Sequence, residues 1–175
     1  SLLLINIYII NMLIKSIGKT MLEFEHSLPM MLYRAIDTIL PRFRRIFSEF
    51  GLTETQWRVL RVLWDRQSAT LKELAAATLI PAPSLVGVVD RLAQQSLVER
   101  VRDENDRRQV FILATTKGRK LEAQVSPAVE DTYREMQQSL NLDTWQALMT
   151  GLEALTQISD TLDTPRPVSP PQIGR

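Results

Sequence analysis

Cysteine is absent from the 175 residues, and histidine occurs once, as His26. The absence of thiols excludes disulfide bonds, cysteine–zinc sites and a cysteine sensor of oxidants. His26 has no second histidine anywhere in the chain with which to share a metal ion. We therefore expect no metal site and no cofactor, and we expect His26 to face solvent near the start of a helix.

The groups on which most enzymes depend are also scarce. The sequence offers no cysteine nucleophile, no histidine base beside a serine, no glycine-rich phosphate loop and no cluster of paired carboxylates. These absences argue against an enzyme and favour a protein that works by binding.

A large excess of one charge is missing as well, since 21 basic residues oppose 20 acidic ones and the formal net charge is +1. Composition alone does not indicate a nucleic-acid-binding protein, but a DNA-binding surface needs only local basicity. Between Arg100 and Lys120 seven residues are basic and three are acidic. We expect this segment to give moderate non-specific affinity for DNA and a salt-dependent specific mode.

The first residues form a hydrophobic run, from Leu2 to Ile14, that is too short for a membrane span, which needs about 20 residues. No basic stretch precedes it and no small-residue cleavage site is evident, so we expect no signal peptide. Residues 1–26 are expected to be an N-terminal extension of a cytoplasmic protein, with Met21 as a candidate translation start. Residues 164–175 contain four prolines and are expected to form a disordered tail.

The most informative pattern begins at Thr70. Thr70 and Glu73 have the spacing of a capping box, so a helix is predicted over residues 71–78. A second helix should open in the segment Pro81-Ala82-Pro83-Ser84, because proline near the first helical position presets the backbone angle. It should run to about Gln95. Two short helices joined by a tight turn are typical of a helix-turn-helix.

Placed in a major groove, the second helix would read bases through its N-terminal residues. Its candidate DNA-binding residues are small or apolar, namely Ala82, Pro83, Ser84, Gly87 and Val88. They can touch thymine methyl groups and lie close to the DNA backbone. None of them can form the bidentate hydrogen bonds that discriminate strongly between bases. We therefore expect sequence specificity to lean on DNA shape.

A β-hairpin is predicted next, because residues 97–102 and 109–114 are rich in β-branched and apolar residues and enclose a polar turn. Arg107 and Arg108 at its tip are candidate DNA contacts, and Arg107 suits the negative potential of a minor groove. Asp106 and Arg108 are expected to pair and stabilise this wing. The alternative is that an exposed hairpin tip is simply charged, but its place directly after a helix-turn-helix favours a DNA-binding wing.

Apolar residues recur at helical spacing on both sides of this region. One domain cannot readily bury all of these stripes, so the flanking helices should interlock with a second copy of the chain. The predicted fold is mainly α with a small β-hairpin wing, in which residues 53–115 form the DNA-binding region and residues 27–52 and 116–163 form a helical dimerisation region. Symmetric pairing would place two recognition helices about 34–36 Å apart, to match a palindromic operator.

Several motifs of this chain resemble the MarR family of transcriptional regulators, over about residues 28–162. The wing motif reads Asp103-x-x-Asp106-Arg107-Arg108 and is followed by Thr115-x-x-Gly118-x-x-Leu121. Further similar segments are Pro83-Ser84-Leu85, Asp90-Arg91-Leu92 and Leu52-Thr53-Glu54-x-Gln56-Trp57-Arg58. Ala114 departs from the pattern, because the family usually has leucine there.

The resemblance implies a homodimeric repressor that binds double-stranded DNA and releases it when a small phenolic or aromatic carboxylate ligand binds. Within the family, Gln56-Trp57-Arg58-x-x-Arg61 and Pro83-Ser84-Leu85-x-Gly87 are similar to the subgroup that represses aromatic-acid degradation, with homoprotocatechuate as its prototype. Ala82 stands where that prototype carries an arginine.

Ligands of the family bind in a cleft between the dimer helices and the DNA-binding lobe, which implies an arginine for the carboxylate and an aromatic wall. The candidate arginines in this chain are Arg34, Arg58 and Arg61, each of which is otherwise an ordinary surface residue. Trp57 is the candidate wall, with a place in the core as its alternative.

A second interpretation stays open, because the recognition helix is poor in base-reading side chains. The chain would then be an architectural or protein-interaction DNA-binding module without a small-molecule inducer. Such a binder prefers flexible DNA generally, whereas a regulator prefers its own site by orders of magnitude.

Overall fold

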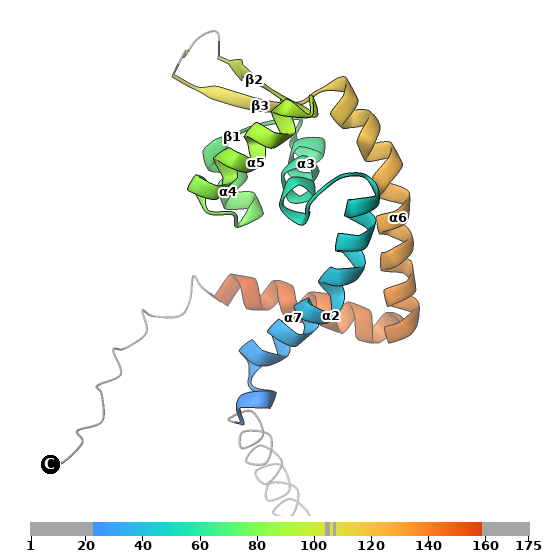
Figure 1. Cartoon of the computed structure of the whole chain (residues 1–175). Helices are drawn as coiled ribbons and strands as arrows, with labels where there is room; N and C mark the ends of the chain where they lie inside the picture. Colours follow the sequence, from blue (N-terminus) through green and yellow to red (C-terminus); the bar gives the residue numbers. More distant parts are fainter. Residues whose placement is uncertain (1–22, 104–105, 107, 159–175) are drawn as a thin grey trace, which may run out of the picture. The chain divides into compact units, whose positions relative to one another are not determined.

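The computed structural model describes residues 23–103, 106 and 108–158 (Figure 1). The chain divides into two compact units, Ser1–Val129 and Glu130–Arg175. The predicted tail over residues 164–175 and most of the predicted N-terminal extension lie outside the described residues. In chain order the elements are η1 (Phe24–His26), α2 (Leu28–Glu49), α3 (Glu54–Arg66), β1 (Ser68–Thr70), α4 (Leu71–Thr78), α5 (Ala82–Gln94), β2 (Val98–Arg102), β3 (Val110–Ala114), α6 (Thr116–Leu140) and α7 (Leu142–Gln157).

Two capping boxes fix the starts of α3 and α4. The hydroxyl of Thr53 accepts from the N–H of Gln56 at 3.2 Å, and the Gln56 side chain accepts from the N–H of Thr53 at 2.9 Å. Thr70 and Glu73 repeat this arrangement at 3.3 and 2.7 Å. Hydrogen bonds from the N–H and the hydroxyl of Thr70 hold the pKa of Glu73 below its ordinary value. The predicted start of the helix over residues 71–78 is therefore confirmed.

Helices α4 and α5 form the helix-turn-helix, and their axes differ by 108°. Leu74 and Thr78 of α4 are buried, and the Thr78 hydroxyl donates to the Leu74 carbonyl at 2.6 Å. Leu85 at the start of α5 is fully buried. Within the described part of the chain, no single helix is long and apolar enough to cross a membrane; by length and composition only this bent pair passes.

The sheet has three antiparallel strands in the order β1-β3-β2. The predicted hairpin is confirmed as β2 and β3, in a register that pairs Val101 with Phe111. The prediction of two strands was incomplete, because β1 adds a third strand and pairs Ala69 with Ile112. Ala69 and Ile112 are both buried, so the added strand closes the core beside α3.

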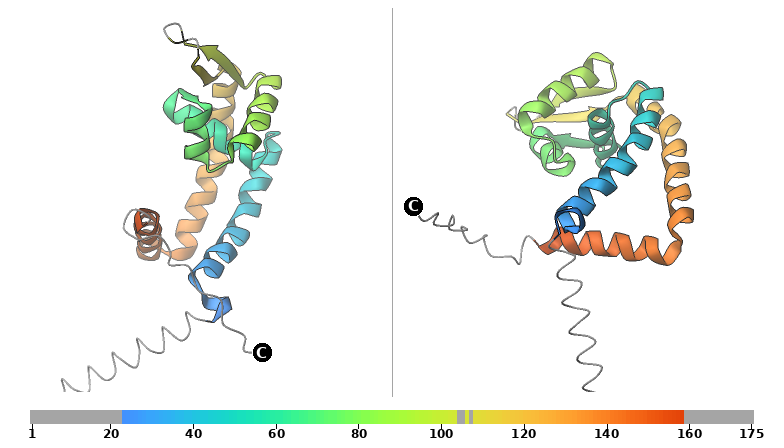
Figure 2. Two further views of the ribbon diagram at one scale, coloured as in Figure 1. Left: turned by 90° about the vertical axis from the view of Figure 1, so that its left-hand side faces the viewer. Right: turned by 60° about the horizontal axis from the view of Figure 1, so that its bottom comes forward.

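The core of the first unit lies between the sheet and helices α3, α4 and α5, and it takes in the end of α2 and the first part of α6. Both views of Figure 2 show the strands gathered with α3, α4 and α5 to one side of the C-terminal end of α2. Gly51, with a φ of +69°, ends α2 in the left-handed conformation that glycine adopts readily. The largest fully buried side chains are Phe47, Leu60, Leu63, Leu74, Leu85, Leu92, Ile112, Val59, Val89 and Val125.

The second unit contains the rest of α6 and all of α7. Asn141 caps α7, because its side-chain oxygen accepts from the N–H of Thr144 at 3.0 Å. The rings of Tyr133 and Trp145 meet edge-on, with centroids 6.4 Å apart. None of the residues of α7 is buried in the single chain. The predicted dimerisation region extended to residue 163, and its last residues, 159–163, lie outside the described residues.

Candidate nucleic-acid interface and ligand clefts

The N-terminal turn of α5 is exposed and uncharged. Pro81 precedes the helix, and Ala82, Pro83 and Ser84 in its first turn all face solvent. The opposite side of the helix is anchored in the core through Leu85, Val88, Val89 and Leu92. The sequence thus fixes one side of α5 and leaves its N-terminal residues free to enter a groove.

One of the predicted DNA-binding residues is misplaced. Val88 is only 3% exposed and packs in the core, so it cannot contact a base. Val86 is 43% exposed and takes the outward position instead. Gly87 is half-buried, and a Cβ atom there would meet no protein atom closer than the Arg91 Nη1, at 3.6 Å. Nothing inside the chain therefore requires glycine at this position.

Leu79, in the turn between α4 and α5, was not singled out from the sequence. Its φ of 55° and ψ of 28° are left-handed, and its side chain is 82% exposed. The adjacent Ile80 is buried, at 5% exposure. The sequence shows two neighbouring apolar residues here and carries no signal for which of them faces solvent.

Backbone hydrogen bonds shape the tip of the wing. The N–H of Asp103 donates to the Gln109 carbonyl at 3.1 Å, and the N–H of Gln109 donates to the Asp106 carbonyl at 2.8 Å. The Asp106 carboxylate accepts from the N–H of Arg108 at 3.0 Å. The two residues therefore do bond to each other, but through the backbone N–H of Arg108, and no ion pair joins their side chains among the described residues. Arg107 lies outside the described residues.

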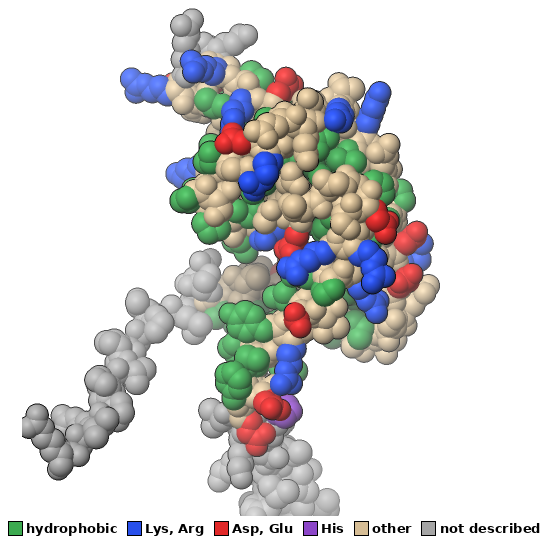
Figure 3. Space-filling view, in the orientation of Figure 1, with side chains coloured by type: hydrophobic (Ala, Val, Ile, Leu, Met, Phe, Trp, Pro, Cys, Tyr) green, Lys and Arg blue, Asp and Glu red, His purple; other side chains and the backbone are tan. Residues whose placement is uncertain are grey.

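An ion pair connects the wing to the recognition helix. The Arg100 guanidinium on β2 lies 2.7 Å from the Asp90 carboxylate on α5. Both side chains are partly exposed, so the pair adds only about 0–1 kcal/mol of stability. The buried apolar side chains of α5 and β2, among them Leu92 and Val98, position the two elements, and the ion pair links them at the surface. Basic side chains gather around the wing, at the upper left of Figure 3, and Arg100, Arg102 and Arg108 are all exposed.

The segment from Thr115 to Gly118 joins the end of α5 to the start of α6. The Thr115 hydroxyl donates to the Ser96 carbonyl at 2.7 Å and accepts from the N–H of Gly118 at 3.1 Å. Trp64 of α3 donates through its indole N–H to the Gly118 carbonyl at 3.1 Å. A Cβ atom at Gly118 would lie 2.2 Å from the Leu97 carbonyl oxygen, so only glycine fits. These contacts explain why threonine and glycine stand three residues apart here.

Three of the predicted ligand residues lie on α3 and already have partners. Arg58 donates to the Thr78 carbonyl, and its guanidinium also lies 3.7 Å from the Glu54 carboxylate. Arg61 is exposed and pairs with Asp65 at 2.6 Å. The half-buried Trp57 stacks on Phe47, with ring centroids 4.6 Å apart.

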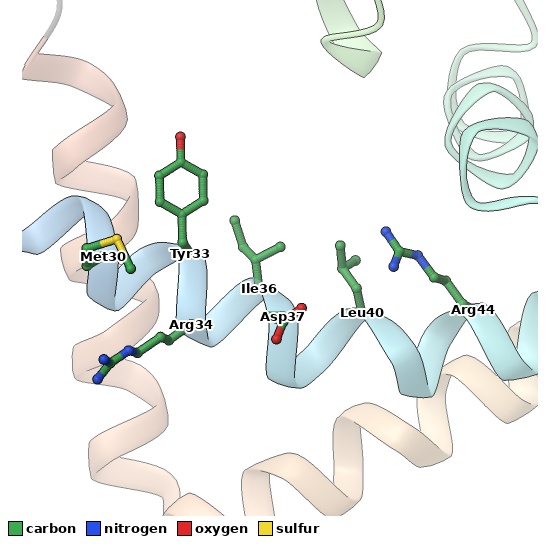
Figure 4. A pocket seen from close by; sticks show the side chains of 7 residues that line it. All are labelled: Met30, Tyr33, Arg34, Ile36, Asp37, Leu40 and Arg44. Atoms are coloured by element: carbon green, nitrogen blue, oxygen red, sulfur yellow. The ribbon is translucent and has the colours of Figure 1, made fainter. Parts of the chain in front are cut away.

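Arg34, the fourth predicted ligand residue, lines a cleft of about 390 Å³ along α2. Figure 4 shows Tyr33, Ile36, Leu40 and Arg44 projecting from one side of the helix, whereas Arg34 extends from another. All of the lining residues come from α2 itself, and Arg58, Arg61 and Trp57 are not among them. In the single chain this cleft is therefore lined by one helix only, and it does not bring Arg34 together with the other three predicted ligand residues.

A second cleft, of about 460 Å³, was not predicted from the sequence. It is lined by Phe50 and Gly51 at the end of α2, by Gln95 and Leu97 after α5, and by residues of α6. Lys117 on its rim donates to the Gln95 carbonyl at 2.8 Å. The cleft therefore borders the same junction of α5 with α6 that Thr115 and Gly118 form.

His26 lies where the sequence predicts, exposed and immediately before α2. Its Nδ1 is 3.5 Å from the Glu23 carboxylate. Over the described residues, no group of three or more His, Asp or Glu side chains could hold a metal ion.

Comparison with known proteins identifies the family. A model described as the MarR family matches residues 52–110. The chain is 30% identical over 138 residues to the HTH-type transcriptional regulator FarR of Neisseria gonorrhoeae, and the match covers 79% of this chain and 94% of that relative. It is also 30% identical over 135 residues to the homoprotocatechuate degradative operon repressor of Escherichia coli, with 77% and 91% of the two chains covered.

The fold matches solved structures of such regulators. The structure of NadR in complex with 4-hydroxyphenylacetate superimposes with a TM-score of 0.71 at 29% identity, over 78% of this chain and 100% of that chain. The transcriptional repressor CouR bound to a 23-mer DNA duplex gives a TM-score of 0.72 at 27% identity, over 78% and 96%. The resemblance and the winged-helix fold inferred from the sequence are confirmed. The chain therefore belongs to the MarR family of transcriptional regulators.

Proposed function

We propose that this protein is a homodimeric repressor that binds a palindromic operator through α5 and the wing. The observation that carries the proposal is the joint geometry of the two elements. The first turn of α5 is exposed, and the same helix is linked to a basic hairpin by the Asp90–Arg100 ion pair of 2.7 Å. This arrangement offers a helix to a major groove and arginines to the neighbouring phosphates. CouR, which has the same fold, was solved bound to a DNA duplex.

We propose that Ala82, Pro83, Ser84 and Gly87 lie at the base edges, and that Arg107 and Arg108 contact the DNA beside them. No catalytic role is proposed for any residue, because the relatives are regulators of transcription. A repressor of this kind would act in the cytoplasm, where its operator lies.

Dimerisation is proposed through the helices outside the winged region, residues 27–52 and 116–163. Tyr33 and Ile36 on α2 are 67% and 51% exposed, and Leu142 and Met149 on α7 are 61% and 49% exposed. Apolar side chains in such numbers are stabilised by burial against another surface. A second copy of the chain supplies that surface with two-fold symmetry.

The proposed inducer is a small phenol or aromatic carboxylate. NadR was solved with 4-hydroxyphenylacetate, and a relative at 30% identity is named for homoprotocatechuate degradation. We propose Arg61 as the carboxylate ligand and Trp57 as the aromatic wall, because both are at least partly exposed on α3. Arg34 would contribute from α2. Arg58 is the weakest candidate, because its guanidinium already binds the Thr78 carbonyl.

The route from ligand to DNA runs through the junction of α5 and α6. Thr115, Lys117 and Gly118 at the start of α6 bond to the backbone that follows α5 or pack closely against it. A shift of α6 at the dimer interface would therefore carry α5 with it. A ligand lowers DNA affinity only to the extent that it binds the displaced form more tightly than the DNA-bound form.

The proposal is tested by fluorescence anisotropy of the full chain on the DNA upstream of its own gene and on a scrambled duplex of equal length. A sequence-specific regulator binds its own site more tightly than other DNA, with an affinity higher by a factor on the order of 1000 or more. Equal affinity for the two duplexes and a preference for flexible DNA in general would favour the architectural alternative instead.

A further inference from the structure

Leu79 occupies a position that is unfavourable for leucine in two independent ways. Its side chain is 82% exposed, and its backbone is left-handed with a φ of 55°. Glycine or asparagine is the usual residue where a helix ends in this conformation, because a larger side chain crowds the backbone. Since so little of Leu79 is covered by the rest of the chain, its apolar side chain contributes little to folding. Folding therefore does not explain the leucine at this position, and we infer that its side chain contacts another molecule.

Leu79 lies directly before the helix end that the proposed function places in the major groove. It precedes Ala82, the first residue of α5, by three positions. Val86, one turn further along, is 43% exposed and follows Pro83 by three residues, so these two share one face of the helix. We call Leu79, Ala82, Pro83 and Val86 the apolar reading patch. None of these side chains carries a hydrogen-bond donor or acceptor.

The chemistry of the patch selects one feature of DNA. The only apolar group on the base edges of a major groove is the 5-methyl group of thymine. Arg91, one helical turn after Gly87, is exposed, and its Nη1 lies 3.6 Å from where a Cβ atom of Gly87 would be, next in sequence to Val86 of the patch. An apolar surface with a cation at its border fits methylated base edges inside a polyanionic groove better than it fits an apolar protein surface.

We propose that Leu79 and Val86 are specificity-determining residues that read thymine 5-methyl groups. This inference rests on the proposed function and adds two residues to the base-reading set. If these residues read methyl groups, sequence specificity comes mainly from direct apolar contact with the bases, and not mainly from DNA shape as expected from the sequence. Each methyl group removed from a contact of this kind should lower affinity about fourfold, the value expected for one buried methylene-sized group.

The test uses a duplex selected by the full-length protein from a random library. This duplex is synthesised once with thymine and once with deoxyuridine, which pairs identically but lacks the methyl group. Anisotropy titrations then compare the wild type with Leu79→Asn and Val86→Ala. Asparagine tolerates the left-handed backbone and alanine favours a helix, so both variants should fold, which circular dichroism checks. Val101→Ala is the matched control, because Val101 on β2 is 44% exposed but lies outside the patch.

The wild type and Val101→Ala should lose more than about tenfold in affinity on the deoxyuridine duplex if two or more methyl groups are read. For Leu79→Asn and Val86→Ala, the affinity for the thymine duplex should exceed the affinity for the deoxyuridine duplex by a smaller factor than it does for the wild type. Equal wild-type binding to both duplexes would overturn the proposal. A loss of the same size in all four proteins would also overturn it, because a change in DNA shape affects every protein alike. No preference for the selected duplex over scrambled DNA would instead refute the proposed function itself.

Discussion

A Cβ atom on Gly118 would lie 2.2 Å from the carbonyl oxygen of Leu97, whereas a Cβ atom on Gly87 would find ordinary contact distances. Gly118 is therefore required by the fold, since the first turn of α6 approaches the backbone after α5 more closely than any side chain permits. Gly87 sits inside a helix, where glycine is less stable than alanine. Nothing inside the chain requires glycine at this position, and we expect that it allows a close approach of DNA, as the proposed function implies.

Gly118→Ala should destabilise the protein by about 1–3 kcal/mol, because the backbone of Leu97 or of α6 must move to admit the methyl group. Urea unfolding followed by circular dichroism measures this change. An unchanged midpoint would show that the contact between α6 and Leu97 is not tight.

Gly87→Ala should have the opposite effect on stability, raising it by about 0.5–1 kcal/mol through helix propensity. At the same time it should weaken operator binding by about tenfold, a loss of about 1.4 kcal/mol, because the added methyl group holds the helix away from the groove. The two readouts are thermal unfolding and DNA anisotropy. A variant that binds DNA as tightly as the wild type would remove Gly87 from the interface.

The valines of α5 show where the sequence was misread at this scale. The buried residues Leu85, Val88, Val89 and Leu92 follow the spacing of one helical face, so periodicity assigns Val88 to the core and Val86 to the outside. The assignment of Val88 to the DNA-contacting set overlooked this pattern. The partner of the Asp106 carboxylate was harder to predict, because the backbone N–H that it accepts from becomes available only through the local fold of the wing tip.

At the scale of elements, local chemistry made the helices predictable. The capping boxes of α3 and α4 involve residues three apart and were visible as sequence motifs. The third strand was not predictable in this way. Residues 68–70 are too short for an alternating pattern, and they become a strand only by pairing with residues 111–113, far along the chain. The clefts were missed for the same reason, because they depend on packing.

Thr70→Ala should cost about 1 kcal/mol, since it removes the hydroxyl that accepts from the N–H of Glu73 at the start of α4. Thr38→Ala is the control, because Thr38 is exposed inside α2 and bonds only to its own helix at Arg34. Chemical unfolding of both variants at neutral pH measures the difference. Equal effects would contradict a specific capping role.

The cap should also depend on pH. Because the pKa of Glu73 is lowered by its hydrogen bonds to Thr70, its ionised form is favoured in the folded state. The contribution of the Glu73 carboxylate to the free energy of unfolding is fully present above the pKa that Glu73 has in the unfolded chain. It is lost as pH falls through the lower pKa that Glu73 has in the folded protein. Thr70→Ala keeps the backbone N–H and removes only the hydroxyl bond to Glu73, so its loss of stability relative to wild type should shrink in acid by the share that this hydroxyl contributes.

Arg107→Ala tests the wing. Removing an arginine that contacts phosphate should weaken binding to operator and scrambled DNA alike. It should also reduce the slope of log affinity against log salt concentration by about 1, because one fewer counterion is released on binding. Lys72→Ala, at an exposed position on α4, is a control for the loss of one positive charge. An unchanged affinity on both duplexes for Arg107→Ala would exclude the wing from the interface.

For the whole molecule, the central question is what covers the apolar faces of α2 and α7. Ile36→Glu should raise the dissociation constant of the dimer on the order of 100-fold or more, because it places an unpaired charge in the interface. Thr38→Glu, outside the α2 cleft, controls for the added charge. Light scattering coupled to size-exclusion chromatography measures the molar mass of each variant and so distinguishes dimer from monomer. A variant that remains a dimer would move the interface away from this face of α2.

The most direct test of the account is a titration of the complex between the full chain and the DNA upstream of its own gene. Fluorescence anisotropy is followed while a panel of hydroxylated aromatic acids, including 4-hydroxyphenylacetate, is added. We expect the protein to bind this DNA much more tightly than scrambled DNA, at least one acid to release it, and Arg61→Ala to abolish that release. Equal affinity for the two duplexes, or a specific complex that no acid dissociates, would contradict a ligand-controlled repressor.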